Sequence, residues 1–241
     1  MHALPWLTEK PIAHRGFHDM NKSVWENTLS AFSRAIDAGF AIECDLQYTA
    51  DGVPVVFHDD DLERLCNMPG DVRAKTSSEL GLLAVGGTGD HIPTLKKMID
   101  FVNARVPIVL ELKGRDGDDE GFAASVLETL EGYNGKVPLM SFKTELLRDL
   151  RELGSPWPVG LTAEGGRAEK WEPYFAILES GIDFISYQVM HLPNPLIDKA
   201  KAMGLPVITW TVRDEAGRQK TNDFADQMTF EGFDPREVVT T

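Results

Sequence analysis

The sequence predicts an α/β fold, a (β/α)8 TIM barrel with a small insertion after the second strand. Short apolar runs alternate with amphipathic stretches along almost the whole chain, a pattern typical of parallel sheets whose strands are joined by helices. The chain has 241 residues, close to the roughly 250 of a typical barrel of this kind. We expect a single domain over residues 1–241, with the insertion at about 48–92.

Apolar runs mark nine candidate strands, one more than a barrel of eight needs. They are Pro11–Gly16, Ala41–Gln47, Val53–His58, Val106–Lys113, Val137–Phe142, Val159–Thr162, Phe184–Gln188, Pro206–Val212 and Gln227–Glu231. Helices are predicted between them, for example over Thr28–Ala38 and Thr144–Leu153, where apolar residues recur on one face.

The surplus strand is Val53–His58. Successive parallel strands need a crossover of a dozen or more residues, and only residues 48–52 separate this run from Ala41–Gln47. Because Asp51-Gly52 is a hairpin signal, we expect Val53–His58 to pair antiparallel, outside the barrel. The stretch 59–92 is too long for a plain connection, so we expect a lid or small subdomain beside the active site.

Composition restricts the possible partners and location. The net charge of −14 and the pI of about 4.8 provide no global field for nucleic acid or an anionic membrane. An anionic substrate would therefore need a local cation, either a metal or a few Arg and Lys side chains. The sequence contains neither a signal-peptide pattern nor an apolar run of transmembrane length, and Cys44 and Cys66 suggest reduced thiols. We expect a cytoplasmic protein without stable membrane association, with a processed periplasmic form as the alternative.

Charged residues stand at the predicted ends of three early barrel strands, in His14-Arg15-Gly16, Glu43-Cys44-Asp45 and Glu111-Leu112-Lys113. Active sites of this fold lie at the C-terminal ends of the strands, and alternate side chains share one strand face. We therefore expect three carboxylates and one ammonium at the barrel mouth, with Cys44 facing away. Converging carboxylates repel one another unless a hard divalent cation neutralises them, and oxygen ligands suit Mg2+ or Ca2+ better than zinc.

Each motif alone also has an ordinary structural explanation. A Glu-x-Asp pair on a strand is usually a solvated edge, Glu-Leu-Lys is an ordinary ion pair, and His58-Asp59 is a turn histidine capped by its neighbour. Their joint placement at strand ends is what favours a catalytic site.

Several further residues have two explanations. In Glu26-Asn27-Thr28, either Asn27 or Thr28 caps the following helix, or Glu26 lies near the metal. Trp210 ends a strand and forms either an apolar wall of the substrate pocket or part of the barrel core. The remaining histidines are expected to be exposed to solvent: His2, His18, His91 and His191.

Together the motifs resemble the signature of glycerophosphodiester phosphodiesterases. In chain order the matching pieces are His14-Arg15-Gly16, Glu26-Asn27-Thr28, Glu43-Cys44-Asp45, Asp51-Gly52, His58-Asp59, Glu111-Leu112-Lys113, Ser141-Phe142 and Trp210-Thr211-Val212. Trp25 replaces the usual proline, and residues 229–233 replace the usual ending of the family. We expect both departures to lie outside the chemical core.

The resemblance implies a metal-dependent barrel enzyme that hydrolyses small glycerophosphodiesters to glycerol 3-phosphate and an alcohol. It implies one divalent cation, Mg2+ or Ca2+, and attack by the substrate's own glycerol hydroxyl through a cyclic phosphate. It also implies the roles of the site residues: Glu43, Asp45 and Glu111 as metal ligands, His14 and His58 as the general acid/base pair, and Arg15 and Lys113 as cations on the phosphoryl oxygens. Trp210 is the candidate apolar wall beside them.

Two other functions compete with this interpretation. A phosphatidylinositol-type phospholipase C or a sphingomyelinase-D-like lipase would need access to a bilayer, and the sequence offers no basic amphipathic helix or apolar insertion loop. A non-catalytic barrel that senses a phosphodiester or a metal would not need two proton-transfer histidines. We therefore expect an enzyme with a small-molecule substrate and no nucleic acid partner.

Overall fold

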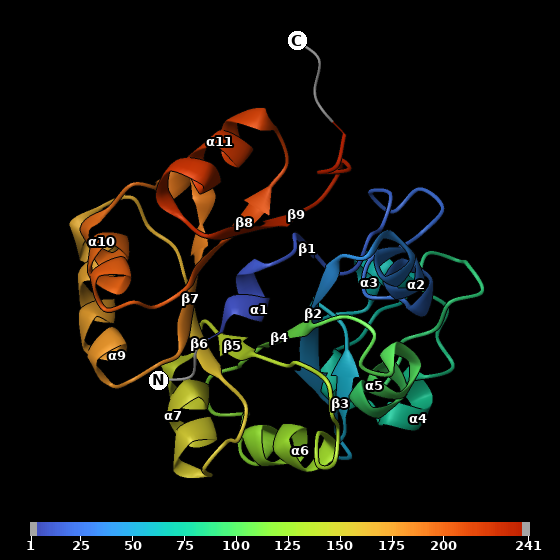
Figure 1. Cartoon of the computed structure of the whole chain (residues 1–241). Helices are drawn as coiled ribbons and strands as arrows, with labels where there is room; N and C mark the ends of the chain where they lie inside the picture. Colours follow the sequence, from blue (N-terminus) through green and yellow to red (C-terminus); the bar gives the residue numbers. More distant parts are fainter. Residues whose placement is uncertain (1–3, 238–241) are drawn as a thin grey trace.

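A computed structural model describes residues 4–237 and contains a closed barrel of eight parallel strands surrounded by helices (Figure 1). The strands follow one another around the ring in the order β1-β9-β8-β7-β6-β5-β4-β2, and β1 pairs with β2 to close it. The predicted TIM barrel is therefore confirmed. The barrel strands are β1 (Ile12–Ala13), β2 (Ala41–Tyr48), β4 (Ile108–Leu112), β5 (Leu139–Ser141), β6 (Val159–Ala163), β7 (Phe184–Gln188), β8 (Val207–Val212) and β9 (Gln227–Phe230).

Helices pack around the ring and supply the crossovers between parallel strands (Figure 1). The longer ones are α2 (Leu29–Ala38), α5 (Leu95–Val102), α6 (Phe122–Thr129), α7 (Thr144–Glu152), α10 (Pro195–Ala202) and α11 (Glu215–Phe224). The shorter ones are α1 (Pro5–Thr8), α8 (Ala168–Trp171) and α9 (Phe175–Glu179), with the 3-10 helices η2 (Glu172–Tyr174) and η3 (Val189–His191). No helix within residues 4–237 combines the length and the apolar character needed to cross a membrane.

The structure shows which of the two candidate residues caps the start of α2. The Thr28 side chain accepts a hydrogen bond from the Ala31 amide, so Thr28 is the N-cap, and Gly39 ends the helix with a φ of 76°. The two predicted helices, over 28–38 and 144–153, thus match α2 and α7 to within a residue.

The first strand is shorter than the predicted run Pro11–Gly16. Arg15 and Gly16 have φ values of 54° and 82°, and this left-handed conformation turns the chain out of the sheet directly after His14. A side chain at Gly16 would also meet Ala31 at 2.8 Å, so glycine is required there. The turn leaves His14 and Arg15 at the C-terminal edge of the barrel.

The surplus strand, β3 (Pro54–Val56), pairs antiparallel with β2, as predicted, with Leu46 opposite Val56. It lies beside β2 outside the ring (Figure 1). The insertion continues through α3 (Glu63–Cys66), η1 (Val72–Ala74) and α4 (Ser77–Leu80). These elements enclose a small apolar cluster of their own: Val55, Phe57, Leu62, Leu65, Val72, Leu80, Val85 and Ile92.

Trp25 joins this insertion to the segment that precedes α2. Its ring packs against the apolar cluster of the insertion and lies so close to Gly86 that a Cβ there would be 2.0 Å from it. The departure from proline at residue 25 therefore serves packing.

The alternation of β2 side chains is as predicted. Cys44 is fully buried in the large apolar cluster that strand and helix residues form together, whereas Glu43 and Asp45 belong to the opposite face. A separate apolar layer fills the barrel interior beneath the polar mouth: Ile12, Ala41, Val109, Met140, Phe184 and Ile208, with Leu4 and Leu7.

Replacing Cys44 by serine should lower stability and leave the expected activity unchanged. A buried hydroxyl without a partner costs roughly 1–3 kcal/mol, and Cys44 is 0% exposed. Burial also raises the pKa of the Cys44 thiol, so thiol reagents should label it only after unfolding. Thermal melts of Cys44→Ser should show this loss, and Cys66→Ser, at a half-buried thiol, should lose less. A Cys44→Ser variant that folds normally but is inactive would mean that the two faces of β2 are assigned the wrong way round.

Candidate active site

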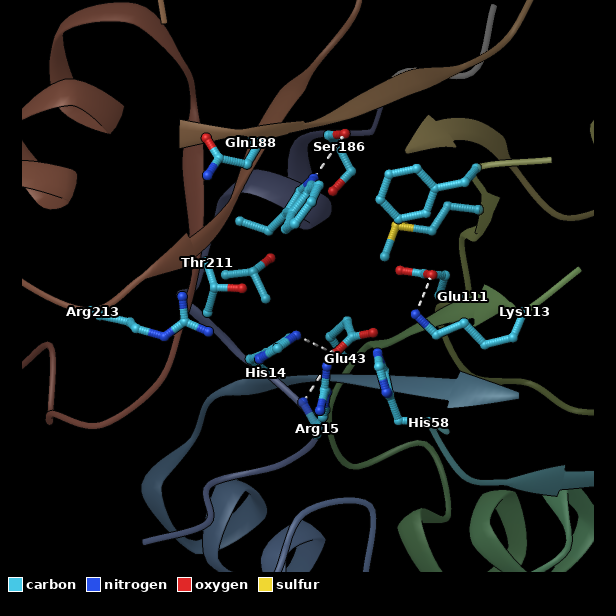
Figure 2. Close-up of a pocket in the computed structure, with 14 residues that line it drawn as sticks. His14, Arg15, Glu43, His58, Glu111, Lys113, Ser186, Gln188, Thr211 and Arg213 are labelled. Carbon is cyan, nitrogen blue, oxygen red and sulfur yellow. Dashed lines mark hydrogen bonds and ion pairs between the residues drawn. The ribbon is translucent and has the colours of Figure 1, made fainter. Parts of the chain in front are cut away.

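A pocket of about 310 Å³ opens at the C-terminal ends of the barrel strands (Figure 2). Seven of the eight predicted site residues line it, and the eighth, Asp45, lies against two of them. Its lining residues are His14, Arg15, Glu43, His58, Glu111, Lys113, Met140, Phe142, Ser186, Gln188, Trp210, Thr211, Arg213 and Thr229. The structure thus brings the predicted residues into one site.

Three buried carboxylates form the centre of this site. Glu43 and Asp45 of β2 and Glu111 of β4 each place an oxygen within 4.8 Å of the others, and the strand register sets Asp45 opposite Glu111. Burial, together with the charges of the neighbouring carboxylates, raises the pKa of Glu43, and burial likewise raises the pKa of Glu111. Oxygen ligands that crowd in this way fit a hard divalent cation.

Two side-chain cations partly balance the carboxylates. Lys113 Nζ lies 2.6 Å from Glu111 Oε1 and 3.0 Å from Asp45 Oδ1. The backbone amide of Arg15 donates to Glu43 Oε2 at 2.9 Å, and the side-chain Nε of Arg15 lies 3.3 Å from Asp45 Oδ2. Although burial favours the neutral acid, the charges of Lys113 and of the other cationic groups around it hold the pKa of Asp45 below its usual range.

His14 is oriented by a carboxylate directly after the last strand. Its Nδ1 lies 2.5 Å from Glu231 Oε2, and its Nε2 lies 3.9 Å from Glu43 Oε2. The hydrogen bond from His14 keeps the pKa of Glu231 low despite burial, so Glu231 is an ionised acceptor. Nδ1 of His14 therefore carries the proton, and burial lowers the pKa of this histidine. Its Nε2 receives no hydrogen bond from residues 4–237 and remains an acceptor at the pocket.

His58 has the same arrangement with a different carboxylate. Its Nδ1 lies 2.7 Å from Asp59 Oδ1. Despite partial burial, hydrogen bonds from Arg64 and His58 lower the pKa of Asp59, so Nδ1 of His58 is again the donor. Its Nε2 has no hydrogen-bond partner in the described part of the chain. Figure 2 shows the two histidines on either side of Glu43, toward the same pocket.

An apolar wall and several polar groups complete the pocket. Trp210 packs edge-on against Phe142 with ring centroids 5.4 Å apart, and its Nε1 donates to the Ser186 carbonyl. Trp210 thus belongs to the pocket wall. Among residues 4–237, the Ser186 and Thr229 hydroxyls find no hydrogen-bond partner although both are buried, which leaves them available to a ligand.

The sequence pattern and the fold are similar to those of known phosphodiesterases. The pattern of the Glycerophosphoryl diester phosphodiesterase family matches residues 14–233. The chain belongs to this family. A glycerophosphodiester phosphodiesterase of Caldanaerobacter subterraneus subsp. tengcongensis is 30% identical over 211 residues, which cover 83% of this chain and 84% of that protein.

Solved structures agree with this membership. A phosphodiesterase of Oleispira antarctica in complex with the product sn-glycerol-3-phosphate aligns with a TM-score of 0.80, 25% identity and 92% coverage of both chains. A glycerophosphodiester phosphodiesterase of Thermotoga maritima shares the fold, with a TM-score of 0.75, 24% identity and coverage of 95% of this chain and 96% of that one. The family is generally dependent on divalent metals, and the acidic cluster of this chain could bind one.

Three expectations about this family member were wrong, those for Glu231, His18 and His191. Glu231 was expected outside the chemical core, yet it contacts His14 directly. His18 was expected to be exposed, yet it is 6% exposed. Its Nδ1 accepts a hydrogen bond from the Met20 amide, so its protonated Nε2 faces Glu231 at 3.6 Å. The available sequence signal was only an acidic residue directly after the last strand.

The structure also shows the positions of Glu26, for which the sequence allowed two explanations, and of the remaining histidines. Glu26 lies outside the three-carboxylate group, and its carboxylate binds Arg15, Arg64 and Asn21 instead. His191 is half-buried, contrary to expectation, and its Nδ1 accepts a hydrogen bond from the Gly165 amide. His91 is exposed, as expected, and His2 lies outside the described residues.

Replacing Glu43 by glutamine should stabilise the metal-free protein near neutral pH. Because the pKa of Glu43 is raised above 4.5 on folding, the folded state binds more protons than the unfolded state. The stabilisation that protonated Glu43 contributes to the folded state is thus fully present below about pH 4.5 and is lost as the pH rises through the raised pKa. The melting temperature of metal-free Glu43→Gln should therefore vary less with pH, between about pH 5 and 8, than that of the wild type.

The same variant should lose the stabilisation that added Mg2+ or Ca2+ gives the wild type, since stabilisation follows binding to the native state. Glu128→Gln, on an exposed position of α6, is the matched control and should change neither measurement. If metal-free Glu43→Gln had a lower melting temperature than the wild type at every pH, repulsion between these carboxylates would not be what destabilises the metal-free protein.

Proposed function

We propose that this protein is a cytoplasmic, metal-dependent phosphodiesterase that hydrolyses glycerophosphodiesters to glycerol 3-phosphate and an alcohol. The observation that carries the proposal is the arrangement around the three carboxylates. Two histidines, each with Nδ1 bonded to its own carboxylate, present Nε2 toward one pocket. The Oleispira antarctica relative, described in complex with sn-glycerol-3-phosphate, supports this product.

Glu43, Asp45 and Glu111 would hold one cation, Mg2+ or Ca2+, because the cluster offers only hard oxygen ligands. When bound, the cation supplies charge neutralisation for the non-bridging phosphoryl oxygens. Arg15 and Lys113, which line the same pocket, would bind these oxygens from the protein side, where developing negative charge is best stabilised by fixed cations.

The histidines would move the protons of both steps. In the first step, one Nε2 takes the proton of the glycerol 2-hydroxyl as that oxygen bonds to phosphorus. The other histidine, protonated at Nε2, gives its proton to the departing alcohol oxygen, and a cyclic phosphate results. In the second step water attacks the cyclic phosphate, the histidines exchange roles, and glycerol 3-phosphate is formed. The wall of Phe142 and Trp210 would pack against the carbon skeleton of the substrate.

The activity should appear with small diesters and depend on a divalent cation. We expect purified protein to release glycerol 3-phosphate from glycerophosphocholine or a related diester, measured by coupled enzymatic detection. Phospholipid vesicles should not be hydrolysed. Chelator should abolish turnover, and Mg2+ or Ca2+ should restore it. Full activity after exhaustive chelation and dialysis would exclude the metal role, and no release from a panel of headgroups would exclude the function.

His14→Ala and His58→Ala should each lower kcat by roughly 10²–10⁴-fold, the usual effect of removing a positioned acid or base. The double variant should lose less than the product of the single losses, because both residues act on one transition state. Near-normal kcat in either single variant would remove that histidine from the mechanism.

Glu231→Gln tests the orientation of His14 within the same series. The amide keeps the size of the side chain, but it can donate to Nδ1 and favour the wrong tautomer, so kcat should fall by roughly 10-fold or more. Adding Glu231→Gln to His14→Ala should produce little further loss, since Glu231 acts through His14. Additive losses would mean that Glu231 has a separate function.

A further inference from the structure

We propose that Arg64, in the insertion, is a positioning residue that orients His58, and to a lesser degree Arg15, through two carboxylates. This inference rests on the proposed function, because it assigns Arg64 to the same phosphodiesterase site. Arg64 lies on α3, and within the described residues it belongs neither to the lining of the active-site pocket nor to the group of three carboxylates. Its effect would therefore be indirect.

The Arg64 guanidinium bridges two carboxylates with paired hydrogen bonds. Nη1 and Nη2 donate to the two oxygens of Glu26 at 2.9 and 2.8 Å. Nε and Nη2 donate to the two oxygens of Asp59 at 2.7 Å each. A planar guanidinium can satisfy two carboxylates in this way because its donors form a rigid fork, which a lysine ammonium lacks.

Each carboxylate passes this restraint to a different residue of the site. Asp59 Oδ1 accepts from His58 Nδ1 at 2.7 Å, and Glu26 Oε1 accepts from Arg15 Nη1 at 2.6 Å. A continuous series of charged groups thus runs from His58 through Asp59, Arg64 and Glu26 to Arg15. Arg64 thereby links the carboxylate that binds His58 to the carboxylate that binds Arg15.

The two ends of the series depend on Arg64 to different degrees. Glu26 is buried and is also held by Arg15 and Asn21, so it would keep its place without Arg64. Within residues 4–237, the side-chain partners of Asp59 are His58 and Arg64. Without Arg64, the Asp59 carboxylate is therefore free to rotate together with the ring that it orients. The main consequence should fall on His58, and hence on kcat.

If Arg64 only anchored the insertion, removing another ionic anchor of the insertion should have the same effect on kcat. The insertion has other ionic anchors, since Arg115 pairs with Asp71 at 2.7 Å and Arg73 pairs with Asp119 at 2.8 Å. Arg115 is a matched control, because it is also a partly exposed arginine that bridges the insertion and the barrel. It contacts Asp71 and Asp60, not a carboxylate bonded to a histidine.

The experiment compares Arg64→Ala, Arg64→Lys and Arg115→Ala in the metal-loaded protein, with glycerophosphocholine as substrate. Arg64→Ala should lower kcat by roughly 10–100-fold, the usual effect of removing a group that orients a site residue, with little change in KM. Arg64→Lys should recover only part of this loss. Millimolar guanidinium chloride, compared with potassium chloride, should raise the kcat of Arg64→Ala and leave Arg115→Ala unaffected. Arg64→Ala combined with Asp59→Asn should be no worse than the worse single variant.

A second measurement does not depend on activity. In nitrogen-15 spectra of the histidine side chains, the wild type should show His58 as one tautomer, with the proton on Nδ1. Arg64→Ala should show exchange between tautomers at His58, while His14 stays unchanged. This result would support the positioning role even if the wild type hydrolysed no diester. Equal losses in Arg64→Ala and Arg115→Ala without guanidinium rescue, or an unchanged His58 signal, would overturn the proposal.

Discussion

The crowding of three buried carboxylates at the barrel mouth is the constraint on which the rest of the site depends. Their oxygens lie within 4.8 Å of one another, where like charges in a low-dielectric environment repel strongly. Lys113 and the backbone and side chain of Arg15 offset part of that repulsion. The same interactions hold Arg15 and Lys113 in fixed positions at the pocket, so the balance of charge also arranges the cationic groups that line it.

Barrel closure sets the orientation of one of the two histidines. His14 and Glu231 are 217 residues apart in sequence, but β1 pairs with β9, with Ala13 opposite Phe230. The next residue on each strand then lies beside the other, and these residues are His14 and Glu231. The hydrogen bond that selects the tautomer of His14 therefore exists only when the first and last strands meet. Correct folding of the whole ring is therefore a condition for this orientation of His14.

The sequence predicted those parts of the structure that depend on local patterns. Alternation along β2 placed Glu43 and Asp45 on one face and Cys44 on the other, and a connection too short for a crossover identified β3 as an antiparallel strand. The contacts of Glu231 and His18 could not be predicted in this way. They depend on the register between strands at opposite ends of the chain and on the left-handed backbone of Arg15 and Met20, residue types that do not signal this conformation. The series from Glu26 through Arg64 likewise depends on how the insertion packs.

The two histidines are consequently supported by different parts of the molecule. The carboxylate that binds His14 is Glu231, directly after barrel strand β9, whereas the carboxylate that binds His58 is its neighbour Asp59, held by Arg64 on α3 of the insertion. A barrel that must close around eight strands tolerates little change near Glu231, because movement there would disturb the strand register. The insertion has its own apolar cluster and can change without opening the ring. Sequence changes in the insertion can therefore alter the orientation of His58, while His14, the three carboxylates and the barrel remain as they are.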